Sequence, residues 1–244
     1  MKVKPFPQEV NQGLSTLVLV ALVVLALVGI PYIEAKVETQ PWGENFTKRL
    51  EDSQFLEVIS SVSIMSALII YIQKGYREEK TRKHREAWKV IEDAESKEMS
   101  PSRIDAMQLL NRDNIPLREI NAIKANLKKI YLEKADLMCS KLEGANLSEA
   151  NLQEVKLDFA HLQRADLQLS ILKDASLLDT NLAQANLAGA DLRGVDFRGS
   201  DLHNANFLES NLEGADLRKT RNLKPDQIKQ AKHWELAKYD EGFV

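Results

Sequence analysis

The feature that most constrains this chain is a leucine that recurs every five residues through its C-terminal half. Of the nineteen positions taken at this interval from Leu127 to Leu217, seventeen are Leu, and Phe197 and Phe207 fill the other two. A period of five matches neither the 3.6-residue period of an α-helix nor the two-residue alternation of a strand. Residues five apart would precess around a helix and could not form one apolar side. The chain must therefore turn at regular intervals, so that each of these residues points inward.

Each central leucine is preceded by two residues of a constant kind. A compact side chain stands two positions before it, as Ala125 does before Leu127, and only Ile130 is large there. The residue directly before it is most often Asn or Asp. Two inward positions per pentad, one small and one large, predict a chain that turns a corner every five residues and buries leucine at its centre. This Ala-(Asn/Asp)-Leu-x-x pattern resembles the pentapeptide-repeat family over residues 115–219.

The resemblance implies an all-β fold, a right-handed quadrilateral β-helix with four pentads in each coil. About five coils at the strand spacing of about 4.8 Å would form a rod about 25 Å long. Residues 86–91, 103–110 and 224–231 also resemble flanking segments of family members that are common in cyanobacteria, which implies a photosynthetic bacterium.

The N-terminal third predicts a membrane anchor. No charged residue lies between Glu9 and Glu34, and residues 14–33 are long enough to cross a bilayer as a helix. The alternative is a cleaved signal peptide, but the apolar stretch is too long and no small-x-small cleavage site follows before Pro41. Residues 55–73 are predicted as a second transmembrane helix. Their uncharged run of 16 residues is marginal for a span, so an interfacial helix is the alternative there.

Charge orients these two segments. Residues 74–89 carry a net charge of +4, whereas residues 34–54 carry −2. The excess of positive charge on cytoplasmic segments predicts a cytoplasmic N-terminus (1–13), an extracytoplasmic loop (34–54) and a cytoplasmic repeat domain. The prediction is an integral protein of the plasma or thylakoid membrane, with the lipid bilayer as a partner and the transmembrane helices as a route to oligomers.

Helical segments are expected on both sides of the repeats. Residues 74–99 are predicted as a charged helical linker. Ser100 before Pro101 predicts the start of an N-terminal capping helix over 100–114, because Ser caps helices and Pro suits their first position. Solenoids need such caps on their terminal coils. The repeats occupy 115–219, and a C-terminal cap is expected over 220–244.

No catalytic, metal or cofactor site is expected. The four histidines show no metal-ligand spacing with Cys139 or with one another, and no glycine-rich phosphate loop is present. The single cysteine excludes an internal disulfide. The chain is therefore predicted not to be an enzyme.

Outward apolar residues suggest where a partner binds. Stacking residues 20 apart places Met138 in line with Leu178, and Cys139 in line with Phe159. Leu169 and Ile171 form another outward pair near a corner. Exposed apolar side chains on a polar rod mark either a partner site or the place where a cap or linker folds back. The candidate partner-binding surface comprises Met138, Cys139, Phe159, Leu178, Leu169 and Ile171.

The predicted function is that of a membrane-anchored scaffold or adaptor, which presents a rigid solenoid to an unidentified membrane or cytoplasmic protein. Regulation of a membrane complex or transporter is compatible with this function. The alternative is a DNA mimic that binds gyrase, as some members of the family do. Residues 115–219 carry 13 Lys and Arg against 16 Asp and Glu, which is too balanced for a mimic of a polyanion. No nucleic-acid partner is expected.

Overall fold

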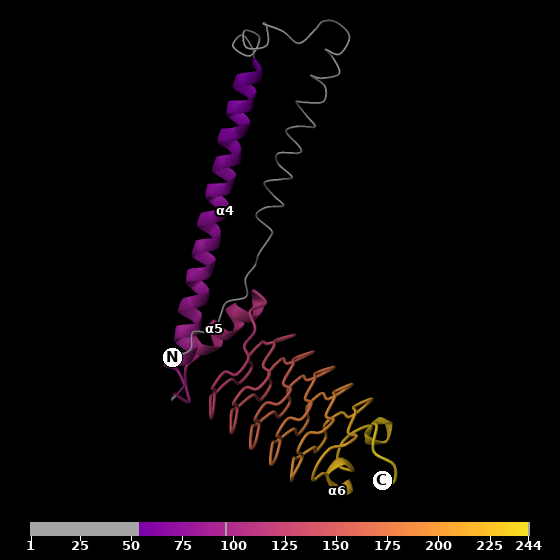
Figure 1. Cartoon of the computed structure of the whole chain (residues 1–244). Coiled ribbons are helices and arrows are strands. Elements are labelled where there is room, and N and C mark those ends of the chain that lie inside the picture. Colours follow the sequence, from indigo (N-terminus) through magenta and orange to yellow (C-terminus); the bar gives the residue numbers. More distant parts are fainter. Residues whose placement is uncertain (1–53, 96, 244) are drawn as a thin grey trace, which may run out of the picture. The chain divides into compact units, whose positions relative to one another are not determined.

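The computed structural model describes residues 54–95 and 97–243. The chain divides between Glu79 and Lys80 into two units. The described helices are α4 (Gln54–Asp93), α5 (Pro101–Arg112), the short α6 (Pro225–Ile228) and the 3-10 helix η2 (Trp234–Leu236). Figure 1 labels α4, α5 and α6.

Between α5 and α6 the chain winds into a column of stacked coils (Figure 1). Parallel bridges join residues 20 positions apart, from Asn121 with Lys141 to Asp201 with Arg221, so each coil holds four pentads. The predicted β-helix is therefore confirmed. One detail differs: the sides pair through isolated one-residue bridges, and the part of the chain that the structure describes contains no continuous strand. A corner every five residues leaves too few extended residues on a side to form one.

The same β-turn closes every pentad. From Glu119 to Lys219, each residue two places after the central position has a positive φ, between 52° and 75°. The amide of the next residue donates to the carbonyl of the central one, as Ile130 N does to Leu127 O at 3.1 Å. A positive φ at the third turn position alone defines a type II turn. Most of these corners hold residues other than glycine, at a cost of roughly 1–2 kcal/mol each.

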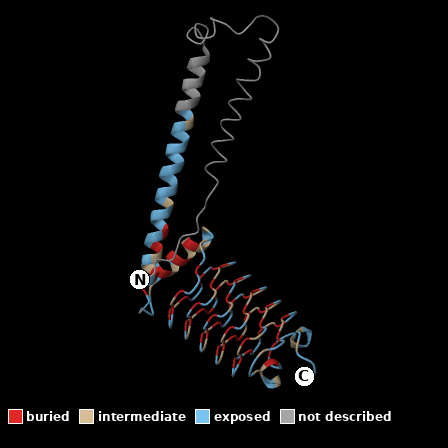
Figure 2. Ribbon diagram, viewed as in Figure 1, coloured by how far each residue is buried: buried red, intermediate tan, exposed pale blue. Residues whose placement is uncertain are grey.

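The two inward positions of each pentad fill the interior of the column (Figure 2). The central Leu and Phe residues from 127 to 217 are at most 2 % exposed, and burying each leucine stabilises the fold by about 1.5–3 kcal/mol. Interior hydroxyls at the small position are satisfied by backbone carbonyls. Thr180 Oγ1 donates to Leu157 O at 2.8 Å, and Ser170 Oγ donates to Leu167 O at 2.7 Å. The core therefore accepts Ser and Thr without unpaired donors.

Helix α5 covers the first coil. Ser100 is its N-cap, with φ −151°, and its Oγ accepts from Arg103 N at 3.3 Å. Met107 and Leu110 are fully buried in the solenoid core. Polar side chains of α5 also pair with open backbone groups of the first coil: Tyr131 N donates to Gln108 Oε1 at 2.8 Å, and Asn111 Nδ2 donates to Glu133 O at 3.0 Å. The cap thus protects an edge that would otherwise be available to another chain.

The C-terminal segment covers the other end. Bridges of Asn211 with Lys232 and of Asp216 with Lys238 continue the stacking. Ile228 is fully buried, and Gln227 Nε2 donates to two carbonyls of the last coil, Leu202 O at 3.0 Å and Ala205 O at 2.9 Å. Both edges of the solenoid are therefore capped through backbone groups as well as apolar contacts.

The predicted membrane localisation is wrong for the part of the chain that the structure describes. Within residues 54–95 and 97–243, no helix combines the length and the apolar character needed to cross a bilayer. Residues 55–73, expected as the second transmembrane helix, belong to α4, which continues without a break to Asp93. The uncharged run there has 16 residues, four of them serines, whereas a span needs about 20 apolar residues. The predicted segments 1–13, 14–33 and all but the last residue of 34–54 lie outside the described residues.

Candidate functional site

The column has four sides, each built from one pentad of every coil. They are named by their central residues: side A has 117, 137, 157, 177, 197 and 217, side B has 122, 142, 162, 182 and 202, side C has 127, 147, 167, 187 and 207, and side D has 132, 152, 172, 192 and 212. Because side chains from different coils stack in columns, residues distant in sequence share one surface.

Side A brings together four of the predicted residues. Cys139 N donates to Asp158 O at 3.0 Å, and Phe159 N donates to Leu178 O at 2.9 Å, so these positions lie in consecutive coils. The Phe159 side chain is 51 % exposed, and Cys139 is an exposed free thiol. Met138 and Leu178 are half-buried. These four residues (Met138, Cys139, Phe159 and Leu178) are called the Phe159 patch.

The corner between sides C and D holds the other predicted pair. Leu169 is 58 % exposed and Ile171 is 42 % exposed. Two further apolar residues adjoin them: Leu169 N donates to Ala188 O at 2.9 Å, and in the next coil Gly189 N donates to Leu208 O at 2.8 Å. Leu208 is 47 % exposed, whereas Ala188 between them is buried. Leu169, Ile171, Ala188 and Leu208 are called the Leu169 patch. The sequence analysis missed Ala188 and Leu208, although their spacing of 20 residues was a signal for them.

The two patches are separate surfaces. Phe159 and Leu169 are ten residues apart, which is half of a 20-residue coil. They therefore occupy diagonally opposite corners of the column. No flat partner surface can contact both at once.

The Asn and Asp residues before the central leucines have a structural role that the sequence analysis did not identify. Their Oδ1 accepts the amide hydrogen two residues on, as Asn126 does from Lys128 N at 3.1 Å and Asn186 does from Ala188 N at 3.2 Å. Such Asx turns hold the chain at the corner. These side chains point outward, but their oxygens are already used by the fold.

Near the C-terminal end, the Asp residue before the central position pairs with an arginine. In Asp191, Asp196 and Asp216, both carboxylate oxygens accept guanidinium hydrogen bonds from the arginine two residues on. For Asp191 the distances are 2.8 and 2.7 Å, and the contact with Arg193 holds the pKa of its carboxyl below the ordinary value. Bidentate pairs of this kind neutralise both charges locally.

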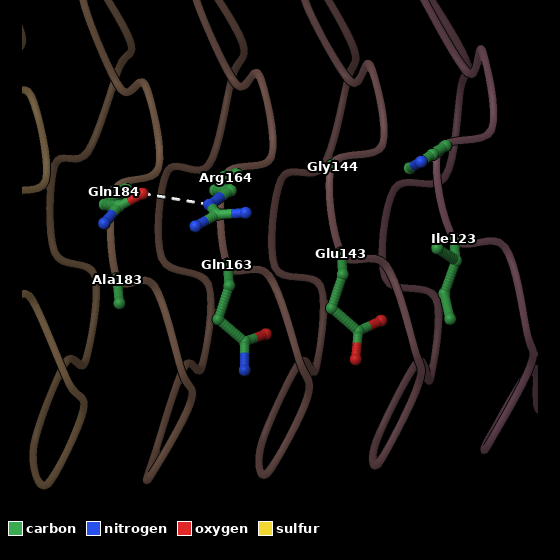
Figure 3. A pocket seen from close by; sticks show the side chains of 8 residues that line it. Ile123, Glu143, Gly144, Gln163, Arg164, Ala183 and Gln184 are labelled. Carbon is green, nitrogen blue, oxygen red and sulfur yellow. Dashed lines mark hydrogen bonds between the residues drawn. The ribbon is translucent and has the colours of Figure 1, made fainter.

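A shallow groove on side B was not predicted. It has a volume of about 420 Å³ and is lined by residues that stand one or two places after the central residue in four consecutive coils. Among them are Ile123, Glu143, Gln163, Arg164 and Ala183 (Figure 3). The residues that line the groove are stacked 20 positions apart but differ in type from coil to coil, so the repeat pattern in the sequence does not reveal them.

Among the described residues, no group of three or more His, Cys, Asp or Glu side chains is placed to hold a metal ion. The expected lack of a metal, of a cofactor and of enzymatic activity stays a prediction.

The coil of four pentads, the buried leucines and the outward patches define a repeat solenoid of the β-helix class. The family model for pentapeptide repeats matches residues 117–153, 150–187 and 180–220, in 8 copies. Residues 117–220 are therefore pentapeptide repeats, and the predicted resemblance to that family is confirmed for this part of the chain.

Solved structures of pentapeptide-repeat proteins are similar to this chain. One from the thylakoid lumen of Arabidopsis thaliana is 28 % identical, with 35 % of this chain and 70 % of that chain covered and a TM-score of 0.30. Rfr23 from the cyanobacterium Cyanothece 51142 is 30 % identical, with coverage of 32 % and 56 % and a TM-score of 0.15. QnrB1, a plasmid-mediated fluoroquinolone resistance protein, is 13 % identical, with coverage of 48 % and 61 % and a TM-score of 0.32. No curated protein sequence matches the chain.

Proposed function

We propose that this protein is a binding scaffold, which presents the Leu169 patch to a polypeptide partner. The observation that carries the proposal is the exposure of Leu169, Ile171 and Leu208, which are 58 %, 42 % and 47 % exposed at one corner of the column. Single exposed apolar residues are ordinary on proteins, but adjoining ones on a polar rim are typical of interaction sites.

The rigidity of the column supports a scaffold role. Backbone hydrogen bonds connect each coil to the next at every pentad, and both ends are capped. A surface held in this way loses little conformational freedom when it binds, which favours affinity. The function then consists in placing a partner, and no chemical step is required of the solenoid.

The Phe159 patch ranks second as a partner site. Only Phe159 and Cys139 are well exposed there, and the neighbouring Asp158 is engaged by the fold. Asp158 Oδ1 accepts from Ser176 Oγ at 2.5 Å and from Leu178 N at 3.0 Å. The carboxylate makes this part of side A more polar than the corner at Leu169.

The proposal is tested by crosslinking and affinity purification of the tagged full chain from the cells that express it. The Leu169→Asp, Leu208→Asp double variant should lose partners that the wild type retains. A Phe159→Asp, Leu178→Asp double variant serves as the matched control, since it adds the same charges at the opposite corner. Retention of every partner by the first variant, or their loss in the second alone, would contradict the proposal for the Leu169 patch.

The DNA-mimic alternative is not favoured by the charge arrangement. Asp191, Asp196 and Asp216 are paired with arginines, so they do not form the free anionic row that a phosphate backbone presents. The alternative stays a prediction. Inhibition of gyrase supercoiling by the full chain would support it.

A further inference from the structure

The groove on side B has an unusual polar composition. Ile123, Glu143, Gln163 and Ala183 occupy the same pentad position in four consecutive coils, and Gly144, Arg164 and Gln184 follow them at the corner (Figure 3). Gly144 has no side chain where the next coil carries Arg164. This absence, together with the small side chain of Ala183, leaves the surface hollowed around Glu143 and Gln163.

Two acceptors in this groove lack a donor. Glu143 Oε2 and Gln163 Oε1 are buried and have no hydrogen-bond partner. Among the described residues, the only other side chain with such atoms is Arg103, in helix α5. An unpaired buried acceptor costs about 1–3 kcal/mol. Two of them in adjacent coils of one groove mark a place where a donor is missing.

Neighbouring side chains do not supply that donor. The other oxygen of Glu143 lies 3.5 Å from His161 Nδ1, and Arg164 Nε donates to Gln184 Oε1 at 2.9 Å. Glu143 and Gln163 extend side by side, away from the row that holds Arg164 and Gln184 (Figure 3). As the side chains stand, none of the described residues donates to these two oxygens.

We infer that Glu143 and Gln163 receive the guanidinium of an arginine from a partner polypeptide that lies in the groove. A guanidinium carries five N–H donors in one plane and can reach a carboxylate and a neighbouring amide oxygen together. Its aliphatic stem would pack on Ile123 and Ala183, since arginine stems bury against apolar surface while the charged end is paired.

The corner residues set a limit on the partner. Lys124 and Arg164 line the same groove, and their positive charge disfavours a polybasic segment. The partner segment is therefore one with a single arginine among neutral or acidic residues, because repulsion of the wrong ligand contributes to specificity. This inference goes beyond the proposed function, because the groove and the Leu169 patch lie on different surfaces of the column.

The test uses the full chain labelled with ¹³C at Ile and Ala methyl groups. The probe is a blocked Ala-Ala-Arg-Ala-Ala peptide, and the matched control peptide has citrulline, which has nearly the same shape without the charge, in place of arginine. Saturable shifts of the Ile123 and Ala183 methyl signals are expected with the arginine peptide. Citrulline, and the isosteric Glu143→Gln variant, should each weaken binding at least about tenfold, because charge-assisted hydrogen bonds are the strong ones.

A control variant and further peptides distinguish the inference from its alternatives. Glu213→Gln removes a carboxylate from the same pentad position on side D and should leave binding unchanged. Equal binding of the arginine and citrulline peptides, binding of a blocked Ala-Ala-Glu-Ala-Ala peptide in their place, or no saturable shift up to about 20 mM would overturn the inference. The Leu169→Asp, Leu208→Asp variant should bind the arginine peptide normally, so failure here is distinguishable from failure of the proposed function.

Discussion

The side chain of Leu169 lies over Gly189 in the next coil, with its Cδ2 2.8 Å from the position that a Cβ on residue 189 would occupy. Gly189 has φ +67°, but most corners with the same turn hold other residues, so the turn alone does not require glycine. What the glycine provides is room for Leu169. The exposed leucine of the Leu169 patch is thus placed by the absence of a side chain one coil away.

Replacing Gly189 with alanine should move Leu169 without unfolding the solenoid. The new Cβ meets the far end of an exposed side chain, which can rotate, so the stability cost should be about 1–2 kcal/mol from the positive φ. Partner capture through the Leu169 patch should fall as well. Urea denaturation and affinity purification of the full chain measure the two effects.

Gly214→Ala is the control for this change. Residue 214 has φ +71°, and its nearest neighbour would be Gly194 N at 4.0 Å, so only the backbone cost applies. An equal loss of partners in both variants would show that the position of Leu169 does not matter.

Asn186, which is half-buried on the outside of the column, should stabilise the stack of coils. Its Oδ1 accepts from Ala188 N at 3.2 Å and from Asn206 Nδ2 at 3.0 Å, and its Nδ2 donates to Asp166 Oδ1 at 3.2 Å. Asn186→Ala removes these three bonds and should lower the free energy of unfolding by about 1–3 kcal/mol. Lys156→Ala, at the same pentad position, should change it by less than about 0.5 kcal/mol. Urea denaturation followed by circular dichroism gives both values, and equal values would contradict the role assigned to Asn186.

The interior of the solenoid was predictable because one period governs it. Leu127, Leu147 and Leu167 occupy equivalent sites in successive coils, and each of these sites needs an inward apolar side chain. The 20-residue stacking then followed from the family resemblance. A one-dimensional core leaves few alternative arrangements for such a sequence.

The surfaces proposed for binding were only partly predictable, because no period governs outward residues. Leu169 and Ile171 stand out within one stretch of sequence, but Leu208 joins them only through the hydrogen bonds between coils. In the sequence, Glu143 and Gln163 resemble the other polar residues of the repeats, and only the structure shows that each has a buried oxygen without a hydrogen-bond donor. The membrane prediction failed for residues 55–73 because it relied on the absence of charge, whereas the uncharged run is neither long enough nor apolar enough to cross a bilayer.

Phe197 and Phe207 should account for a large part of the stability of the later coils. Their rings contact edge to face, with centroids 6.2 Å apart, and both side chains are at most 1 % exposed. Phe197→Ala should cost about 3–5 kcal/mol, because it leaves a cavity between coils that cannot collapse freely. The double variant with Phe207→Ala should lose less than the sum of the two single losses, since the rings share a contact.

Phe159→Ala provides the comparison for an outward phenylalanine. Because its side chain is 51 % exposed, the loss of stability should be within about 0.5 kcal/mol. Chemical denaturation of the four variants (Phe197→Ala, Phe207→Ala, their combination and Phe159→Ala) measures these differences. A loss at Phe159 as large as that at Phe197 would contradict the assignment of inward and outward positions.

Asp113 should make the N-terminal cap sensitive to acid. Its Oδ2 lies 2.7 Å from His84 Nε2 and 3.7 Å from Lys80 Nζ, so it joins the later part of α4 to the end of α5. The hydrogen bond from His84 holds the pKa of the Asp113 carboxyl below its ordinary value. In the unfolded chain this carboxyl takes up a proton near pH 4, whereas in the folded protein it stays ionised to lower pH.

A lowered pKa in the folded state stabilises the protein above the unfolded value, and that contribution disappears as pH falls through the folded value. Asp113→Asn should therefore reduce the free energy of unfolding by about 1–3 kcal/mol at pH 7. The difference from the wild type should shrink steadily below about pH 4. Asp105→Asn, which removes an exposed carboxylate from the same helix, should show no comparable loss. A deficit of the Asp113 variant that stays constant from pH 7 to about pH 2 would show that shape, and not charge, makes Asp113 matter.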